Sequence, residues 1–205
     1  MFYGEKNIIE DILNTKFNNK DILDVHVGNR SQIYRINNKF AVKIFIKDYE
    51  AEIIAYEKLK GLNFLPKFYG KNEEMKMLIM EWINGDFFDN YIQKYRKLPD
   101  NFINDYFSVK IEMSKRHCYD YDSKISELCW DNEKVRKVDY GQVEYCKNED
   151  SMNRKLNDLY IQKEKLLNNK DDEWNQFCQD VLYPQGVENS IVVKYRKLLQ
   201  KDTLK

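Results

Sequence analysis

Short apolar runs dominate the first 80 positions of the chain and predict strands. The segments 33–36 and 40–45 are rich in β-branched and aromatic residues, and the pair Asn37-Asn38 lies between them, which is the pattern of a β-hairpin. The runs 65–69 and 75–80 are also strand-like, and the polar residues 71–74 between them predict a turn. This part of the sequence therefore predicts a small antiparallel sheet.

Within this sheet-forming region, one segment has the apolar spacing of a helix. It begins at Asp48, the expected N-cap, and Gly61 follows its last turn, as glycine commonly does at helix ends. We therefore expect one helix to accompany the sheet.

After Gly85 the spacing is mostly helical. One helix is predicted to open at Pro99, and apolar stripes within 174–182 and 191–199 each follow one helix face, as expected for core positions. With a boundary at 84–86, the pattern predicts an α+β chain: residues 1–84 form the sheet-rich part and residues 85–205 a reduced, mainly helical part.

Composition narrows the class of protein. The chain has 205 residues, 42% of them hydrophobic, and its 34 basic and 34 acidic residues cancel. No apolar run approaches the roughly 18 residues of a membrane span, and balanced charge argues against nucleic acid as a partner. The first residues lack a secretory signal pattern. Four cysteines without a close pair and two histidines argue against zinc. We expect a cytoplasmic location, with export as an effector left open.

Four separated segments carry candidate chemistry. The first places Lys43 on a strand among apolar neighbours, with Glu52 nine positions further on, in the helix. A buried ammonium needs a carboxylate or a phosphate as partner. Taken singly, such a lysine is more often an edge residue whose charged end reaches solvent.

Two of the other three segments are equally ambiguous when taken one at a time. Residues 78–85 are predicted to form a buried strand followed by a connector that ends in glycine. The connector is either a plain linker between domains or a segment whose backbone groups pair with the edge of an adenine ring. The polar stretch 120–124 is either a solvated loop or a source of a catalytic carboxylate. Residues 135–141 end a strand with an acid, an aromatic and a glycine, and an acid there can hold Mg²⁺.

The order of these segments resembles the protein-kinase-like superfamily, and in particular its small, atypical bacterial members. Ala41-Val42-Lys43 is similar to the strand-lysine motif, and 79–85 to the gatekeeper and hinge. Asp139-Tyr140-Gly141 resembles the metal-binding Asp-Phe-Gly, and Asp120-Tyr121-Asp122 stands where His-Arg-Asp belongs. The resemblance spans about residues 25–141 and implies a bilobal fold, an ATP site and Mg²⁺.

The resemblance also implies roles for single residues. Lys43, oriented by Glu52, would contact the α- and β-phosphates, with Glu50 or Glu57 as fallback partners for the lysine. The remaining implied roles are adenine binding by the backbones of Glu81 and Ile83, phosphate-loop contact at Gly28, general base at Asp122, γ-phosphate contact by Lys124, and Mg²⁺ binding by Asp139 and Glu127.

Several features depart from the family pattern. The segment 26–31 holds a single glycine, so its amides approach phosphates less easily, and Asn29 or Ser31 would substitute side-chain donors. Glu127 replaces the usual Asn and adds negative charge. Only 64 residues follow Gly141.

Three functions follow from the resemblance and its departures. The leading expectation is an ATP- and Mg²⁺-dependent protein Ser/Thr kinase. The alternatives are a pseudokinase that acts as a binding module and a small-molecule kinase of the aminoglycoside or choline type. A protein substrate or a regulatory protein is the expected partner.

Overall fold

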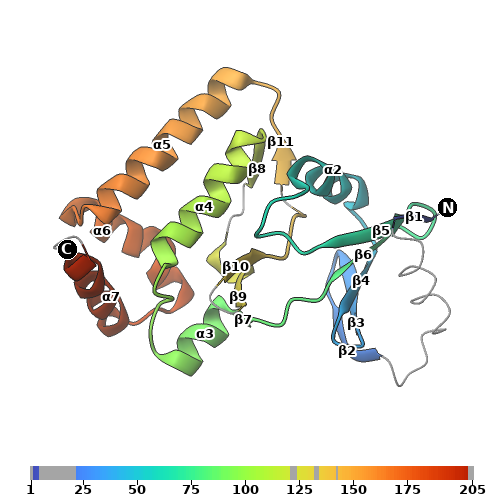
Figure 1. The fold of residues 1–205 in the computed structure, drawn as a ribbon, viewed down its shortest axis with the longest axis horizontal. Coiled ribbons are helices and arrows are strands. Elements are labelled where there is room, and N and C mark those ends of the chain that lie inside the picture. Colours follow the sequence, from blue (N-terminus) through green and yellow to red (C-terminus); the bar gives the residue numbers. More distant parts are fainter. Residues whose placement is uncertain (1, 5–21, 121–123, 132–133, 142, 203–205) are drawn as a thin grey trace.

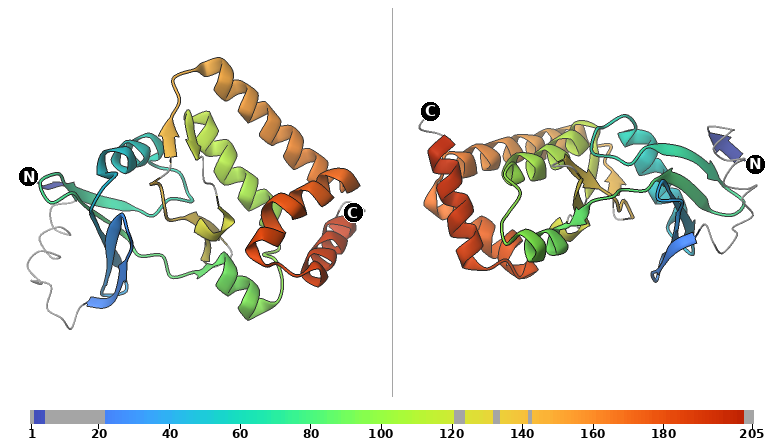
Figure 2. Two further views of the ribbon diagram at one scale, coloured as in Figure 1. Left: turned by 180° about the vertical axis from the view of Figure 1, so that it is seen from behind. Right: turned by 60° about the horizontal axis from the view of Figure 1, so that its bottom comes forward.

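A computed structural model of the chain describes residues 2–4, 22–120, 124–131, 134–141 and 143–202. A sheet with one helix lies at one end of the molecule, and a group of helices lies at the other (Figure 1). The two further views show the same separation, with a few extended segments joining the ends (Figure 2). None of the described helices is long and apolar enough to cross a membrane.

The sheet is antiparallel throughout, with strand order β1-β5-β6-β4-β3-β2. Its strands are β1 (Phe2–Gly4), β2 (Ile22–Val27), β3 (Ser31–Ile36), β4 (Phe40–Phe45), β5 (Phe68–Asn72) and β6 (Met77–Glu81). The strand β4 is therefore central, with β3 on one side and β6 on the other.

The predicted hairpin is confirmed as β3 and β4, which pair from Ser31 opposite Phe45 to Ile36 opposite Phe40. Asn37 and Asn38 have φ values of 50° and 55°, the left-handed conformation that two-residue hairpin turns require and that asparagine tolerates. The turn closes with the Lys39 N–H donating to the Ile36 carbonyl at 3.0 Å.

The predicted helix is α2 (Tyr49–Leu59), and Gly61 follows it with φ +85°. The prediction that Asp48 caps this helix is wrong. Asp48 occupies the N-cap position, but its own φ is 65° and its side chain makes no capping hydrogen bond. Its carboxylate lies instead 3.5 Å from Arg30 Nε.

The turn predicted at 71–74 lies further along the chain. Asn72 is buried at the end of β5, and its side-chain oxygen accepts a hydrogen bond from the Met75 N–H at 3.1 Å. This Asx interaction moves the reversal beyond Asn72, and β6 begins at Met77.

The second part of the chain holds the remaining helices and three short antiparallel pairings. The helices are α3 (Phe88–Tyr95), α4 (Phe102–Lys115), α5 (Glu149–Leu167), α6 (Asp171–Phe177) and α7 (Asn189–Asp202), and a π-helical segment, Cys178–Leu182, continues α6. The strands β7 (Asp86–Phe87), β9 (Leu128–Asp131) and β10 (Lys134–Lys137) form one small sheet, and β8 (Cys118–Asp120) pairs with β11 (Val143–Tyr145).

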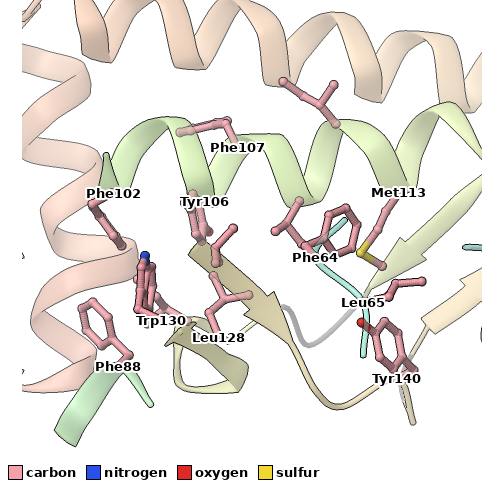
Figure 3. Close-up of a cluster of buried hydrophobic side chains, with 14 of the residues drawn as sticks. Phe64, Leu65, Phe88, Phe102, Tyr106, Phe107, Met113, Leu128, Trp130 and Tyr140 are labelled. Carbon is pink, nitrogen blue, oxygen red and sulfur yellow. The ribbon is translucent and has the colours of Figure 1, made fainter. Parts of the chain in front are cut away.

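Aromatic side chains form the centre of the helical part. Phe88, Phe102 and Trp130 meet with ring centroids 5.7 to 6.0 Å apart, and the cluster continues toward Tyr140 (Figure 3). The core therefore runs from the helices to the junction with the sheet. It fixes β9 and β10, the strands that flank the candidate site.

Candidate functional site

Lys43 and Glu52 form a buried ion pair between the sheet and its helix. Lys43, in the central strand β4, is 5% exposed, and Glu52, in the first turn of α2, is 1% exposed. Lys43 Nζ lies 2.6 Å from Glu52 Oε1 and 2.8 Å from Oε2. Burial raises the pKa of Glu52, and the Lys43 charge opposes that shift. The structure thus brings Glu52 to Lys43, whereas the fallback Glu57 pairs with Lys71 at 3.1 Å.

Asp139 reaches the same ammonium from the helical part. Its Oδ1 lies 3.5 Å from Lys43 Nζ and accepts the Gly141 N–H at 3.0 Å. Burial acts to raise the pKa of Asp139, but Lys43 and the Gly141 N–H outweigh it, so the pKa lies below its usual value. The Asp139 side chain is 55% exposed. It is therefore an ionised carboxylate that faces solvent.

Tyr140 fixes the backbone next to Asp139. Its ring is fully buried and packs on Tyr56 of α2, with centroids 4.8 Å apart. Its hydroxyl donates to the Lys137 carbonyl at 2.5 Å. The tyrosine therefore anchors this segment against the helix that carries Glu52.

Lys137 is a second buried cation, whose charge acts to lower the pKa values of Glu52 and Asp139, and the sequence interpretation did not identify it. Its Nζ lies 2.6 Å from Asp120 Oδ2 and 2.6 Å from Glu127 Oε2, and Lys137 is 2% exposed. Burial acts to lower the pKa of Lys137, but the two carboxylates raise it above its usual value. The sequence held one signal for this site. The hydrophobic strand pattern around Lys137 predicts that it is buried, and a buried ammonium requires carboxylate partners.

A cleft of about 250 Å³ lies where these groups meet. Its lining is mostly charged and comprises Arg30, Ser31, Lys43, Phe45, Lys47, Asp48, Glu52, Lys124, Glu127, Asp139 and Gly141. Six residues expected from the sequence therefore share one cleft, namely Ser31, Lys43, Glu52, Lys124, Glu127 and Asp139. Arg30 was not expected there; it lies in the β2–β3 turn, within the single-glycine segment 26–31, and contributes a guanidinium to the cleft.

The connector between the two parts lies at the end of β6. The Glu81 N–H donates to the Lys67 carbonyl, and the Trp82 N–H donates to the Lys39 carbonyl, both at 2.8 Å. The Glu81 carboxylate lies 2.6 Å from Arg136 Nη2 of β10. Ile83 follows in the extended segment before β7, and its adenine contact stays a prediction.

One further expected residue, Gly28, lies outside the cleft. Gly28 closes the β2–β3 turn by donating its N–H to the Ser31 carbonyl at 2.9 Å, and it does not line the cleft. Asp122, the expected general base, lies outside the described residues, so its role stays a prediction.

The donor set of the cleft suits a magnesium–nucleotide complex. The exposed carboxylate of Asp139 is the hard oxygen donor that Mg²⁺ prefers, and Arg30, Lys43 and Lys124 supply the positive charge that polyphosphates need. Glu127 fits a second metal less well, because Lys137 already binds one of its oxygens. Among the described residues no group of three or more His, Cys, Asp or Glu converges on one point.

No family model and no curated protein matches the chain. Among solved structures, the Cydia pomonella granulovirus kinase PK-1 is similar, with a TM-score of 0.53 at 15% sequence identity. The match covers 68% of this chain and 61% of the viral kinase, so the chain spans about three-fifths of that protein. At this identity the likeness concerns the fold alone. The α+β chain, with its sheet-rich and helical lobes, therefore has a bilobal kinase-like fold.

Proposed function

We propose that the protein is an ATP- and Mg²⁺-dependent phosphotransferase that acts on a hydroxyl. The observation that carries the proposal is the meeting of Lys43, Glu52 and Asp139 from three separate elements at one cleft. A lysine oriented by a glutamate suits the α- and β-phosphates, and an ionised aspartate opposite it suits the Mg²⁺ that bridges the phosphates. Lys124 and Arg30 would then offset charge on the γ-phosphate.

The transfer balances without any further reactant. The acceptor hydroxyl oxygen forms a bond to the γ-phosphorus, and the bond from that phosphorus to the β,γ-bridging oxygen breaks, leaving ADP and a phosphoester. The hydroxyl proton passes to a carboxylate, for which Asp122 is the candidate by its position in the sequence.

The acceptor has two candidates. The resemblance favours a protein Ser or Thr hydroxyl. A small-molecule hydroxyl is the second candidate, and the observation that favours it is a cavity that shares Lys124 with the cleft.

The test compares Lys43→Met with Lys39→Met, an exposed lysine in the hairpin turn just before the same strand. Calorimetric titration with ATP, with and without Mg²⁺, and ADP release are measured for both variants and for the wild type. We expect Lys43→Met to lower turnover about 100-fold, which corresponds to about 3 kcal/mol of transition-state stabilisation. Lys39→Met should behave as the wild type does.

Three results would count against the proposal. Equal turnover in wild type and Lys43→Met would exclude catalysis at this cleft. ATP binding without Mg²⁺ dependence would contradict the metal role of Asp139. Mg²⁺-dependent binding with no ADP release from the wild type would identify a pseudokinase instead.

A further inference from the structure

A second cavity lies between α4, α5 and β8, and Lys124, Leu128 and Lys137 complete its lining. Its volume is about 230 Å³, and α4 and α5 lie side by side in both ribbon figures (Figures 1 and 2). Lys124 lines both this cavity and the phosphate cleft. The two spaces therefore adjoin at a residue placed to contact the transferred phosphate.

The charged side chains around the cavity are predominantly basic. Four lysines line it, namely Lys110, Lys124, Lys137 and Lys155, against two acids, Asp120 and Asp158. The Asp120 charge is already matched by Lys137 at 2.6 Å. Taken together, four lysines against two acids give the lining a positive net charge.

Lys110 is the cation best suited to a ligand. Its ammonium lies 4.4 Å from the centroid of the Tyr106 ring, on the same helix. Burial lowers its pKa to about 8, although Asp120 and Tyr119 oppose that shift. Within the described part of the chain, no hydrogen bond or ion pair to Lys110 is found. Asp120, the carboxylate that favours the charged form of Lys110, is already bound by Lys137 at 2.6 Å. An anionic ligand would therefore lower the free energy of this half-buried ammonium.

The rest of the lining is apolar or aromatic. Val109 and Met113 of α4 face Leu159 of α5 across the space, and Lys155 Nζ lies 3.3 Å from the centroid of the Tyr119 ring. Such a mixture of a cationic anchor and apolar walls suits a ligand with one acidic group and a compact apolar body.

We propose that this cavity binds a small organic carboxylate, with its acid group at Lys110 and its body between α4 and α5. Because Lys124 joins the cavity to the phosphate cleft, the site is the acceptor subsite of the phosphotransferase; this last step rests on the proposed function. The acceptor class is then a small hydroxylated carboxylic acid.

The test uses 4-fluorobenzoate as the probe and follows its binding to the full chain by fluorine NMR. The neutral 4-fluorobenzamide is the matched ligand of nearly equal shape. Lys110→Met removes the anchor, and Lys115→Met is the control on the same helix, where an exposed lysine pairs with Glu112 at 2.6 Å. We expect the acid to bind at least about tenfold more tightly than the amide, and about tenfold more weakly to Lys110→Met than to Lys115→Met.

Equal binding of acid and amide to the wild type, or equal binding of the acid to both variants, would overturn the cavity proposal. The comparison of acid with amide uses only the wild-type protein, so it tests the cavity proposal even where Lys110→Met does not fold. Bound Mn²⁺-ADP should broaden the fluorine signal of the bound acid. An unbroadened signal when both Mn²⁺-ADP and the acid are bound would overturn the acceptor role. Acid binding that persists when Mg²⁺-ATP does not bind would contradict the proposed function but support the cavity.

Discussion

At the scale of the residue, Lys137 explains how the site tolerates an unusual glutamate. Glu127 adds a negative charge close to where a triphosphate would lie, and Lys137 offsets that charge from inside the protein. Burial raises the pKa of Glu127, and the neighbouring ammonium opposes the shift and favours the ionised form. The lysine therefore stabilises two carboxylates, Asp120 and Glu127, that would otherwise repel each other.

Lys137→Met should destabilise the fold by about 3–5 kcal/mol, because it leaves the buried Asp120 and the partly buried Glu127 without their cation. The measurement is urea unfolding followed by circular dichroism. Lys134→Met, an exposed lysine at the start of the same strand, should change stability by less than about 0.5 kcal/mol. Similar unfolding midpoints for the two variants would show that the internal cation is dispensable.

At the scale of the element, the segment that leaves the sheet is fixed by one glycine. A Cβ at Gly85 would lie 2.4 Å from Cys129 Sγ and 2.6 Å from the Trp130 carbonyl oxygen. The adjoining strand β7 pairs with β9 through Asp86 and Phe87. The close approach at Gly85 therefore lets the connector reach the small sheet that carries the site.

Gly85→Ala should destabilise the protein by about 1–3 kcal/mol, because the backbone of Trp130 cannot move aside without breaking the β7–β9 pairing. Thermal unfolding checks this expectation. Gly28→Ala is the matched control, since its Cβ would lie an ordinary 3.4 Å from the Ser31 carbonyl oxygen. A Gly85→Ala protein as stable as Gly28→Ala would mean that the connector adjusts freely.

At the scale of the whole molecule, the lobes are joined by polar contacts across the connector. Arg136 of β10 binds Glu81 at 2.6 Å and donates to the Leu65 carbonyl at 2.9 Å. The Lys137 N–H donates to the Phe64 carbonyl at 2.9 Å. The segment after α2 thus contacts the strand that precedes Asp139, and these hydrogen bonds join the two lobes beside the cleft.

A double-mutant cycle of Glu81→Gln and Arg136→Met should give a coupling energy of about 1–2 kcal/mol, because the pair is largely shielded from solvent. The exposed pair Lys97 and Asp100, with its atoms 2.9 Å apart, serves as the reference and should couple by less than about 0.5 kcal/mol. Unfolding free energies of the single and double variants give both values. A coupling at Arg136 no larger than the reference would argue against a fixed junction.

Local signals in the sequence predicted the elements well where one short-range interaction dominates. Asn37-Asn38 supports the left-handed turn by itself, and the apolar stripe of α4 repeats at helical spacing. The same reasoning failed at Asp48 and Asn72, where a partner distant in sequence or a buried side chain decides the local conformation.

The sequence by itself determined the order of sheet and helices and the separation of Lys43 from Asp139 along the chain, because hydrophobic periodicity and turn chemistry are local properties. The tertiary structure alone decided that Glu52 rather than Glu57 meets Lys43, that Lys137 lies between Asp120 and Glu127, and that Arg30 enters the cleft. Those pairings depend on the spatial distance and the burial of charged groups that are far apart in the chain. The spacing of residues along the sequence contains no information on either quantity.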